Sequence, residues 1–124
     1  MPFIPPAQAP TFHMHGATFT GLASPSRGSC ETAVWVVELC AGAAGASHRL
    51  TREEVFVALA GSAVAKVGDE VFHVTTGGAL VVPPGVDFAL SNPHGEPFRA
   101  VAVLPVGGQA VVPQGQPFTP PWAA

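Results

Sequence analysis

Charged residues are scarce in this chain. Only 10% of its 124 residues are Asp, Glu, Lys or Arg, and the net charge is −3. The five Lys and Arg residues are scattered singly, so the sequence has no basic stripe that could follow a phosphate backbone. We therefore predict no nucleic acid partner.

Long apolar runs and cysteines are also few. No stretch approaches the roughly 20 apolar residues that a membrane-spanning helix needs, and the start MPFIPPAQAP lacks the features of a signal peptide. We predict a cytoplasmic protein with no membrane partner. Nine residues separate Cys30 from Cys40, which is not a metal-binding spacing and, at the two ends of one strand, is too far for a disulfide. Reduced, partly buried thiols are expected.

Apolar residues, glycine and proline are abundant instead. Hydrophobic residues make up 48% of the chain, and the 14 glycines and 14 prolines cluster between runs rich in Val, Phe and Ala. Many short runs separated by turn signals are typical of an all-β sandwich or barrel, and this length suits one hydrophobic core. We predict a single domain over residues 1–124, with a Pro-rich arm at 1–10 and a Pro-rich tail at 109–124.

The runs predict strands, and none of them has the periodicity of a capped helix. The segment 31–40 has alternate apolar residues on both faces, so both faces need cover from a second sheet, a loop or another subunit. In the tail, Phe118 and Trp122 are expected to dock on a groove or on a neighbouring subunit. The predicted strands occupy residues 11–20, 31–40, 47–50, 53–60, a hairpin in 62–76 that turns at Gly68-Asp69, two strands in 79–92, and 97–106.

Two segments share a regular frame of glycine and proline. The first runs Gly42, five residues, His48, one residue, Leu50, three residues, Glu54, six residues, Gly61. The second runs Gly77, five residues, Pro83, one residue, Gly85, two residues, Phe88, three residues, Asn92, and fifteen residues lie between the two frames. Together they resemble the two motifs of the cupin family, over about residues 42–106. The resemblance implies a cupin-type double-stranded β-helix, or jelly-roll, barrel, and a homodimer, since small cupins commonly pair.

The resemblance also implies where a metal would bind. Cupin metal sites use two histidines and a glutamate from the first motif and one histidine from the second. Here His48 and Glu54 match, whereas Leu50 and Phe88 stand at the other two positions. One imidazole and one carboxylate hold a divalent ion weakly, so we predict either no cofactor or a weakly bound divalent metal.

The remaining pair suggests a function without a metal. A carboxylate beside an imidazole can fix its tautomer, and in an apolar pocket such a dyad suits acid/base work. We predict that the barrel binds a small, largely apolar molecule, and that His48, oriented by Glu54, can catalyse a dehydration, isomerisation or cyclisation. The pocket is expected to be lined by Leu50, Phe88, Trp35, Phe56 and Asn92.

Two alternatives remain open from the sequence. His13 and His15 lie two apart in the predicted strand 11–20 and so share a face, where they could rebuild a metal shell with His48 and Glu54; they could equally be surface residues. The barrel could also be a non-catalytic ligand-binding or regulatory protein.

Overall fold

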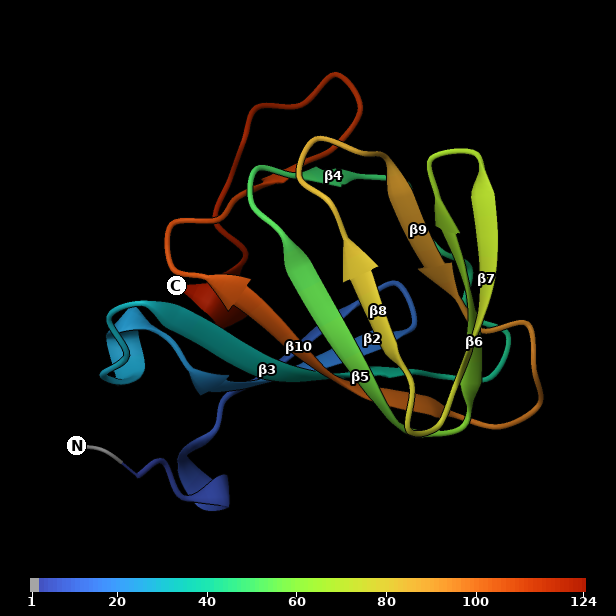
Figure 1. The fold of residues 1–124 in the computed structure, drawn as a ribbon. Helices are drawn as coiled ribbons and strands as arrows, with labels where there is room; N and C mark the ends of the chain where they lie inside the picture. Colours follow the sequence, from blue (N-terminus) through green and yellow to red (C-terminus); the bar gives the residue numbers. More distant parts are fainter. Residues whose placement is uncertain (1–2) are drawn as a thin grey trace.

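Short β-strands are the main regular elements of the part of the chain described by the computed structural model, residues 3–124 (Figure 1). Three single turns of 3-10 helix join them, and within residues 3–124 no helix is long and apolar enough to cross a membrane. The elements are η1 (Pro6–Gln8), β1 (Thr11–Met14), β2 (Ala17–Ala23), η2 (Pro25–Arg27), β3 (Thr32–Leu39), β4 (Arg49–Leu50), β5 (Glu54–Ala60), β6 (Ser62–Val67), β7 (Glu70–Thr75), β8 (Ala79–Val82), β9 (Phe88–Ser91), β10 (Phe98–Pro105), β11 (Ala110–Val111) and η3 (Pro121–Ala123).

The strands form two main sheets that enclose the core. The larger has the order β1-β2-β3-β10-β5-β8, the smaller has the order β7-β6-β9, and β11 pairs with β4 at one end. All the pairings are antiparallel, and neighbours such as β3 and β10 are far apart in the sequence, as in a jelly roll. The predicted all-β fold of the jelly-roll type is therefore confirmed.

Alternation along the central strands decides what faces inward. In β3 the alternate residues Ala33, Trp35, Val37 and Leu39 are all buried, as predicted. The neighbouring β10 buries every second residue from Phe98 to Leu104, each with no exposed surface. This period of two places one apolar face of each strand in the interior of the barrel.

The turns fall where glycine and proline predicted them, with one exception. Gly68 and Asp69 form the two-residue loop between β6 and β7, and Gly68 has a φ of +59°. The exception is the single strand predicted for residues 11–20, which is wrong. The segment 11–20 instead forms a hairpin, because His15 (φ +49°) and Gly16 (φ +81°) both adopt positive φ between the paired residues Met14 and Ala17. Two consecutive residues at positive φ make a tight hairpin loop and not an extended strand.

The cysteines lie just outside the two ends of β3. Both Cys30 and Cys40 are free, and both are exposed, so the expected partial burial is wrong. The extended strand holds them apart, and the positions beyond its ends face solvent.

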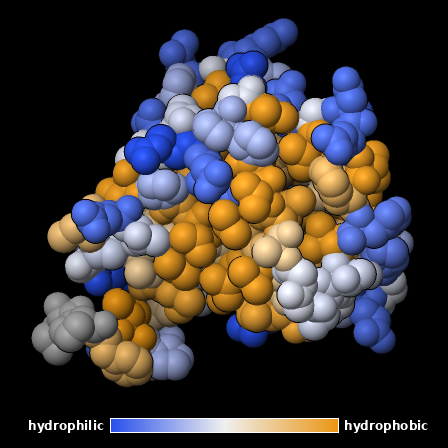
Figure 2. Space-filling view, in the orientation of Figure 1, coloured by the Kyte–Doolittle hydropathy of each residue, from blue (hydrophilic) through white to orange (hydrophobic). Residues whose placement is uncertain are grey.

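The outer face of the larger sheet is apolar as well. Its register aligns Val34, Val103, Val55 and Val81 in one row across four strands, and Val36, Val101 and Val57 in the next. Val57 and Val81 are 38% and 53% exposed. Figure 2 shows hydrophobic residues gathered over the region where β5, β8, β10 and β3 lie in Figure 1. No second sheet covers this face within residues 3–124.

Candidate functional site

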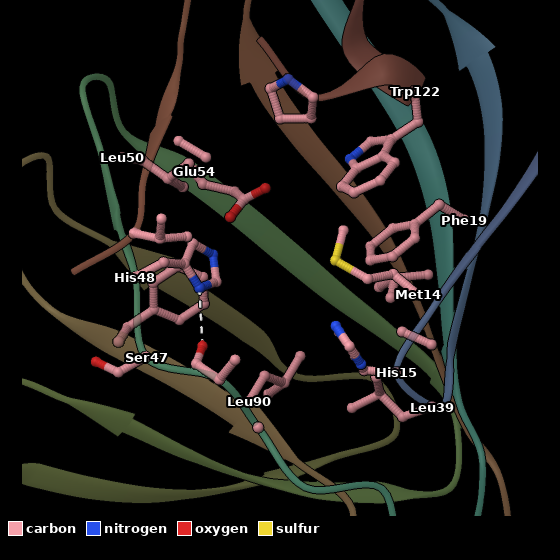
Figure 3. Close-up of a pocket in the computed structure, with 18 of the residues that line it drawn as sticks. Met14, His15, Phe19, Leu39, Ser47, His48, Leu50, Glu54, Leu90 and Trp122 are labelled. Atoms are coloured by element: carbon pink, nitrogen blue, oxygen red, sulfur yellow. Dashed lines mark hydrogen bonds between the residues drawn. The ribbon is translucent and has the colours of Figure 1, made fainter. Parts of the chain in front are cut away.

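A cavity of about 200 Å³ lies inside the barrel, and its walls are almost wholly apolar (Figure 3). The β1–β2 hairpin, β3, β5, β9, the segment 44–48 and the C-terminal segment all contribute to it. Only three of the lining side chains among residues 3–124 are ionisable, namely His15, His48 and Glu54. The cavity can therefore enclose an apolar molecule while offering it few polar contacts.

Glu54 is the most deeply buried of these three groups. It is the first residue of β5, is 3% exposed, and directs its carboxyl group into the cavity (Figure 3). Burial raises the pKa of this carboxyl from its ordinary value of 4.5 to about 8. At neutral pH the group is therefore mostly protonated and can donate a hydrogen bond, which a carboxylate cannot do.

His48 is held in place by the backbone. Its main chain exchanges two hydrogen bonds with Phe88, of 3.0 and 2.8 Å, and its ring lies 4.4 Å from the Phe88 ring centroid. Its Nδ1 lies 3.0 Å from the carbonyl oxygen of Ala46, so Nδ1 carries the proton and donates it to that oxygen (Figure 3). This bond leaves Nε2 as the nitrogen that is free to exchange a proton with a ligand.

The dyad predicted from the sequence is not formed. No hydrogen bond or ion pair joins His48 to Glu54 among the described residues, and the Ala46 carbonyl, not Glu54, orients the imidazole. His48 precedes β4 whereas Glu54 begins β5, so the two side chains enter the same cavity from different walls (Figure 3). Both side chains therefore face the cavity without a hydrogen bond between them.

Four of the five predicted pocket residues line the cavity, and the fifth does not. Leu50, Phe88, Trp35 and Phe56 all contribute to its wall. Asn92 is fully buried elsewhere and serves the backbone: its Nδ2 donates to the Leu39 and Glu96 carbonyls at 3.1 and 2.7 Å, and its Oδ1 accepts from the His94 N–H at 3.1 Å. The role of Asn92 is therefore structural, because its side chain forms an Asx turn in the NPHGEP loop.

The C-terminal segment supplies a wall that the motifs did not predict. Trp122 stacks on Phe19 with ring centroids 3.7 Å apart and an interplanar angle of 2°, and its carbonyl accepts a 3.1 Å hydrogen bond from Arg27 Nη2. The expected docking of Trp122 thus occurs on the chain's own barrel, while Phe118 lines the cavity but stays 39% exposed. Other lining residues missed from the sequence are Met14, Phe19, Leu39, Ser47 and Leu90.

The rebuilt metal shell is not assembled. His15 lines the cavity, but His13 points elsewhere, with its Nδ1 3.3 Å from the Thr18 hydroxyl oxygen. Among residues 3–124, no three His, Cys, Asp or Glu side chains lie close enough together to hold a metal ion. With Leu50 and Phe88 at two of the family's ligand positions, the donors present do not fit the metal that cupins of the full motif bind.

Comparison with known proteins gives the family. The family model described as "Cupin domain" matches residues 35–104. The fold is similar to that of the polyketide cyclase RemF from Streptomyces resistomycificus (TM-score 0.73, 19% identity, 85% of this chain and 79% of that one). An RmlC-like cupin from Shewanella frigidimarina NCIMB 400 is equally similar (TM-score 0.73, 19% identity, 85% and 90%).

A structure of DMSP lyases is also similar (TM-score 0.75, 16% identity, 86% of this chain and 63% of that one). No curated protein matches the chain. At these identities the similar structures establish the fold alone.

Proposed function

We propose that this chain, which belongs to the cupin family, binds a small, largely apolar molecule in its barrel and moves a proton on it. The observation that carries the proposal is the Glu54 carboxyl: the residue is only 3% exposed, it faces an apolar cavity, and its side chain makes no hydrogen bond to the described residues. A buried polar group without a partner costs stability. A ligand that carries an oxygen acceptor would satisfy this group.

The cavity volume limits the size of the ligand. A cavity of about 150 Å³ holds a benzene molecule, so the 200 Å³ here suits one ring with a short substituent. Aromatic walls from Trp35, Phe56, Phe88 and Trp122 favour a planar apolar body. The ligand class we infer is a small carbonyl compound with a single ring or a comparable apolar group.

The two polar groups suit proton abstraction beside a carbonyl. Glu54, as a neutral acid, would donate a hydrogen bond to the carbonyl oxygen, and Nε2 of His48 would take a proton from the adjacent carbon. The C–H electron pair then forms the enol double bond as the oxygen receives the Glu54 proton. Isomerisation, dehydration and cyclisation can share such a step, and one protein of similar fold is a polyketide cyclase.

Acetophenone is a suitable probe, and the two tryptophans of the chain, Trp35 and Trp122, both line the cavity and report its binding by fluorescence. In D₂O we expect the protein to speed deuterium incorporation into the acetophenone methyl group, followed by proton NMR. Glu54→Gln keeps a hydrogen-bond donor but cannot transfer the proton. It should retain affinity within about threefold while exchange slows by about 100-fold, because a positioned acid contributes about that factor.

His48→Gln should slow exchange by a similar factor, since it removes the base. The matched controls are Glu53→Gln and His94→Gln, which alter exposed residues outside the cavity and should leave exchange unchanged. Binding of acetophenone without any exchange would reject the catalytic step and leave a ligand-binding barrel. Absence of binding would reject the proposal as a whole.

We also propose that a second copy of the chain covers the apolar outer face of the larger sheet. The face is self-complementary: its two valine rows carry no charge, and beside them Glu38 and Arg99, opposite in charge and paired in register, form no ion pair with each other. A two-fold axis through such a face buries the rows against each other and offers each charge the opposite one on the other copy.

Val57→Lys tests this assembly. A lysine in the second valine row would bury a charge in the interface, so the protein should change from a dimer to a monomer in size-exclusion chromatography with light scattering at micromolar concentration. Val71→Lys is the control, because Val71 is 57% exposed on β7 of the other sheet. A wild-type protein that is monomeric at high concentration would contradict the proposal.

A further inference from the structure

His15 occupies an unusual backbone position for a histidine. It is the first residue of the two-residue loop between β1 and β2, at a φ of +49°, where glycine, asparagine and aspartate are the preferred residues. A side chain with a Cβ pays conformational strain there. The loop would form at least as well with asparagine, so the turn by itself does not account for a histidine.

The loop brings His15 to the mouth of the cavity. Figure 3 shows His15 and His48 approaching the cavity from opposite sides, with Glu54 directed into it from a third. His15 is exposed and Glu54 is buried, so the cavity has a polar group at its base and the His15 imidazole at its opening. The His15 ring makes no hydrogen bond to any of residues 3–124.

We propose that the ligand carries a second oxygen group, a carboxylate, which His15 holds at the cavity mouth, so that Nε2 of His48 stays free to act as the base. This inference rests on the proposed binding of a carbonyl compound in the cavity. It adds the chemical class of the group at the other end of that ligand. The ligand would then be a short keto acid with an apolar body, its carbonyl oxygen at Glu54 and its carboxylate at the mouth.

No acidic side chain that lines the mouth among residues 3–124 opposes an anion. Among residues 3–124, no lysine or arginine lines the cavity and Glu54 is the only acidic residue that does, so no carboxylate at the opening competes for the His15 imidazole. Both ring nitrogens of His15 lack a hydrogen-bond partner among residues 3–124. The N–H of this ring would donate a hydrogen bond to a bound carboxylate, and a hydrogen bond to a charged group is stronger than one between neutral groups.

Two probes of the same shape separate charge from size. 4-Acetylbenzoate carries the carboxylate and 4-acetylbenzamide a neutral amide in its place, so the ratio of their affinities measures recognition of the charge. We expect the wild-type protein to bind the carboxylate at least about 10-fold more tightly, which is the usual effect of a hydrogen bond to a charged group. Titration followed by tryptophan fluorescence gives both affinities.

His15→Asn is the decisive variant, because asparagine is preferred in this turn and keeps the hairpin. The ratio of the affinities for 4-acetylbenzoate and 4-acetylbenzamide should fall to about threefold or less. A purely structural role of His15 would leave this ratio unchanged. His13→Asn is the control on the same hairpin, since His13 does not line the cavity, and it should keep the preference. Thermal unfolding of both variants verifies their fold.

The outcomes distinguish this inference from the function on which it rests. If acetophenone binds but 4-acetylbenzoate and 4-acetylbenzamide bind equally well to the wild type, the proposed carboxylate recognition is rejected and the carbonyl site stands. If the preference exists but survives in His15→Asn, the assignment to His15 is overturned. If acetophenone does not bind, the proposed function fails first.

Discussion

The free energy of unfolding of the unliganded protein is expected to fall by about 4 kcal/mol between pH 4.5 and 8 through the titration of Glu54 alone. Burial raises the pKa of this carboxyl to about 8, whereas in the unfolded chain it has its ordinary value of 4.5. In this range the folded protein keeps the proton and the unfolded chain has lost it. Raising the pH therefore favours unfolding, by about 1.4 kcal/mol for each pH unit.

The sign of this effect is opposite to that of a carboxylate in an ion pair. The contribution of Glu54 is fully present below pH 4.5, declines as the pH rises, and is lost above about 8. Urea denaturation at several pH values measures it, with Glu54→Gln as the comparison. Since glutamine does not titrate, the difference between the two proteins isolates this residue from the others that titrate.

Glu54→Gln should be more stable than the wild type at pH 8 and lose that advantage toward pH 5. Glu53→Gln, at the exposed neighbouring position, should follow the wild type throughout. Parallel stability curves for the wild type and Glu54→Gln would contradict the burial of a neutral acid. They would also remove the physical basis of the proposed hydrogen bond to a carbonyl ligand.

The second large effect is expected from Trp122→Ala, which should lower the free energy of unfolding by about 3–5 kcal/mol, the usual range for a buried large aromatic residue. Trp122 is only 8% exposed, stacks on Phe19, and lies 6.2 Å from the Phe12 ring centroid. Its removal leaves a hole where the C-terminal segment meets the barrel. Urea denaturation at a fixed pH of about 5, where Glu54 contributes most, measures the loss.

Phe118→Ala is the matched control in the same segment. Phe118 is 39% exposed, so its truncation should cost much less, and the cross-barrel contacts of Trp122 remain. Trp122→Phe should recover part of the stability, because a smaller ring can still stack on Phe19. Equal costs for Trp122→Ala and Phe118→Ala would contradict the view that Trp122 anchors the segment.

Glu54 and Trp122 both line the cavity, but they have opposite effects on the stability of the protein. Glu54 lowers the stability of the unliganded protein at neutral pH, whereas Trp122 stabilises the wall that encloses it. A protein selected only for stability would replace a buried, unpartnered carboxyl group with an apolar side chain, and functional sites are where such costs are retained. The balance is consistent with a cavity maintained for a ligand.

Much of this architecture could be predicted from local pattern. Alternation in 31–40 and 97–106 predicted which residues of β3 and β10 face inward, and Gly68-Asp69 predicted a hairpin, because side-chain direction in a strand and positive φ in a turn are local properties. The glycine frame from Gly42 to Asn92 placed Leu50 and Phe88 beside His48. The local pattern failed at His15, because a histidine at positive φ is rare and the segment otherwise alternates.

The sequence by itself therefore determined the class of fold, the strands, and the replacement of two family metal ligands by apolar residues. Only the tertiary structure decided how the polar groups are used. Glu54 and His48 enter the cavity from different walls, Asn92 serves a loop, and His15 and Trp122 reach the cavity from the two ends of the chain. These relations depend on which strands lie side by side in the barrel, and on the burial that results, and neither can be read from local spacing.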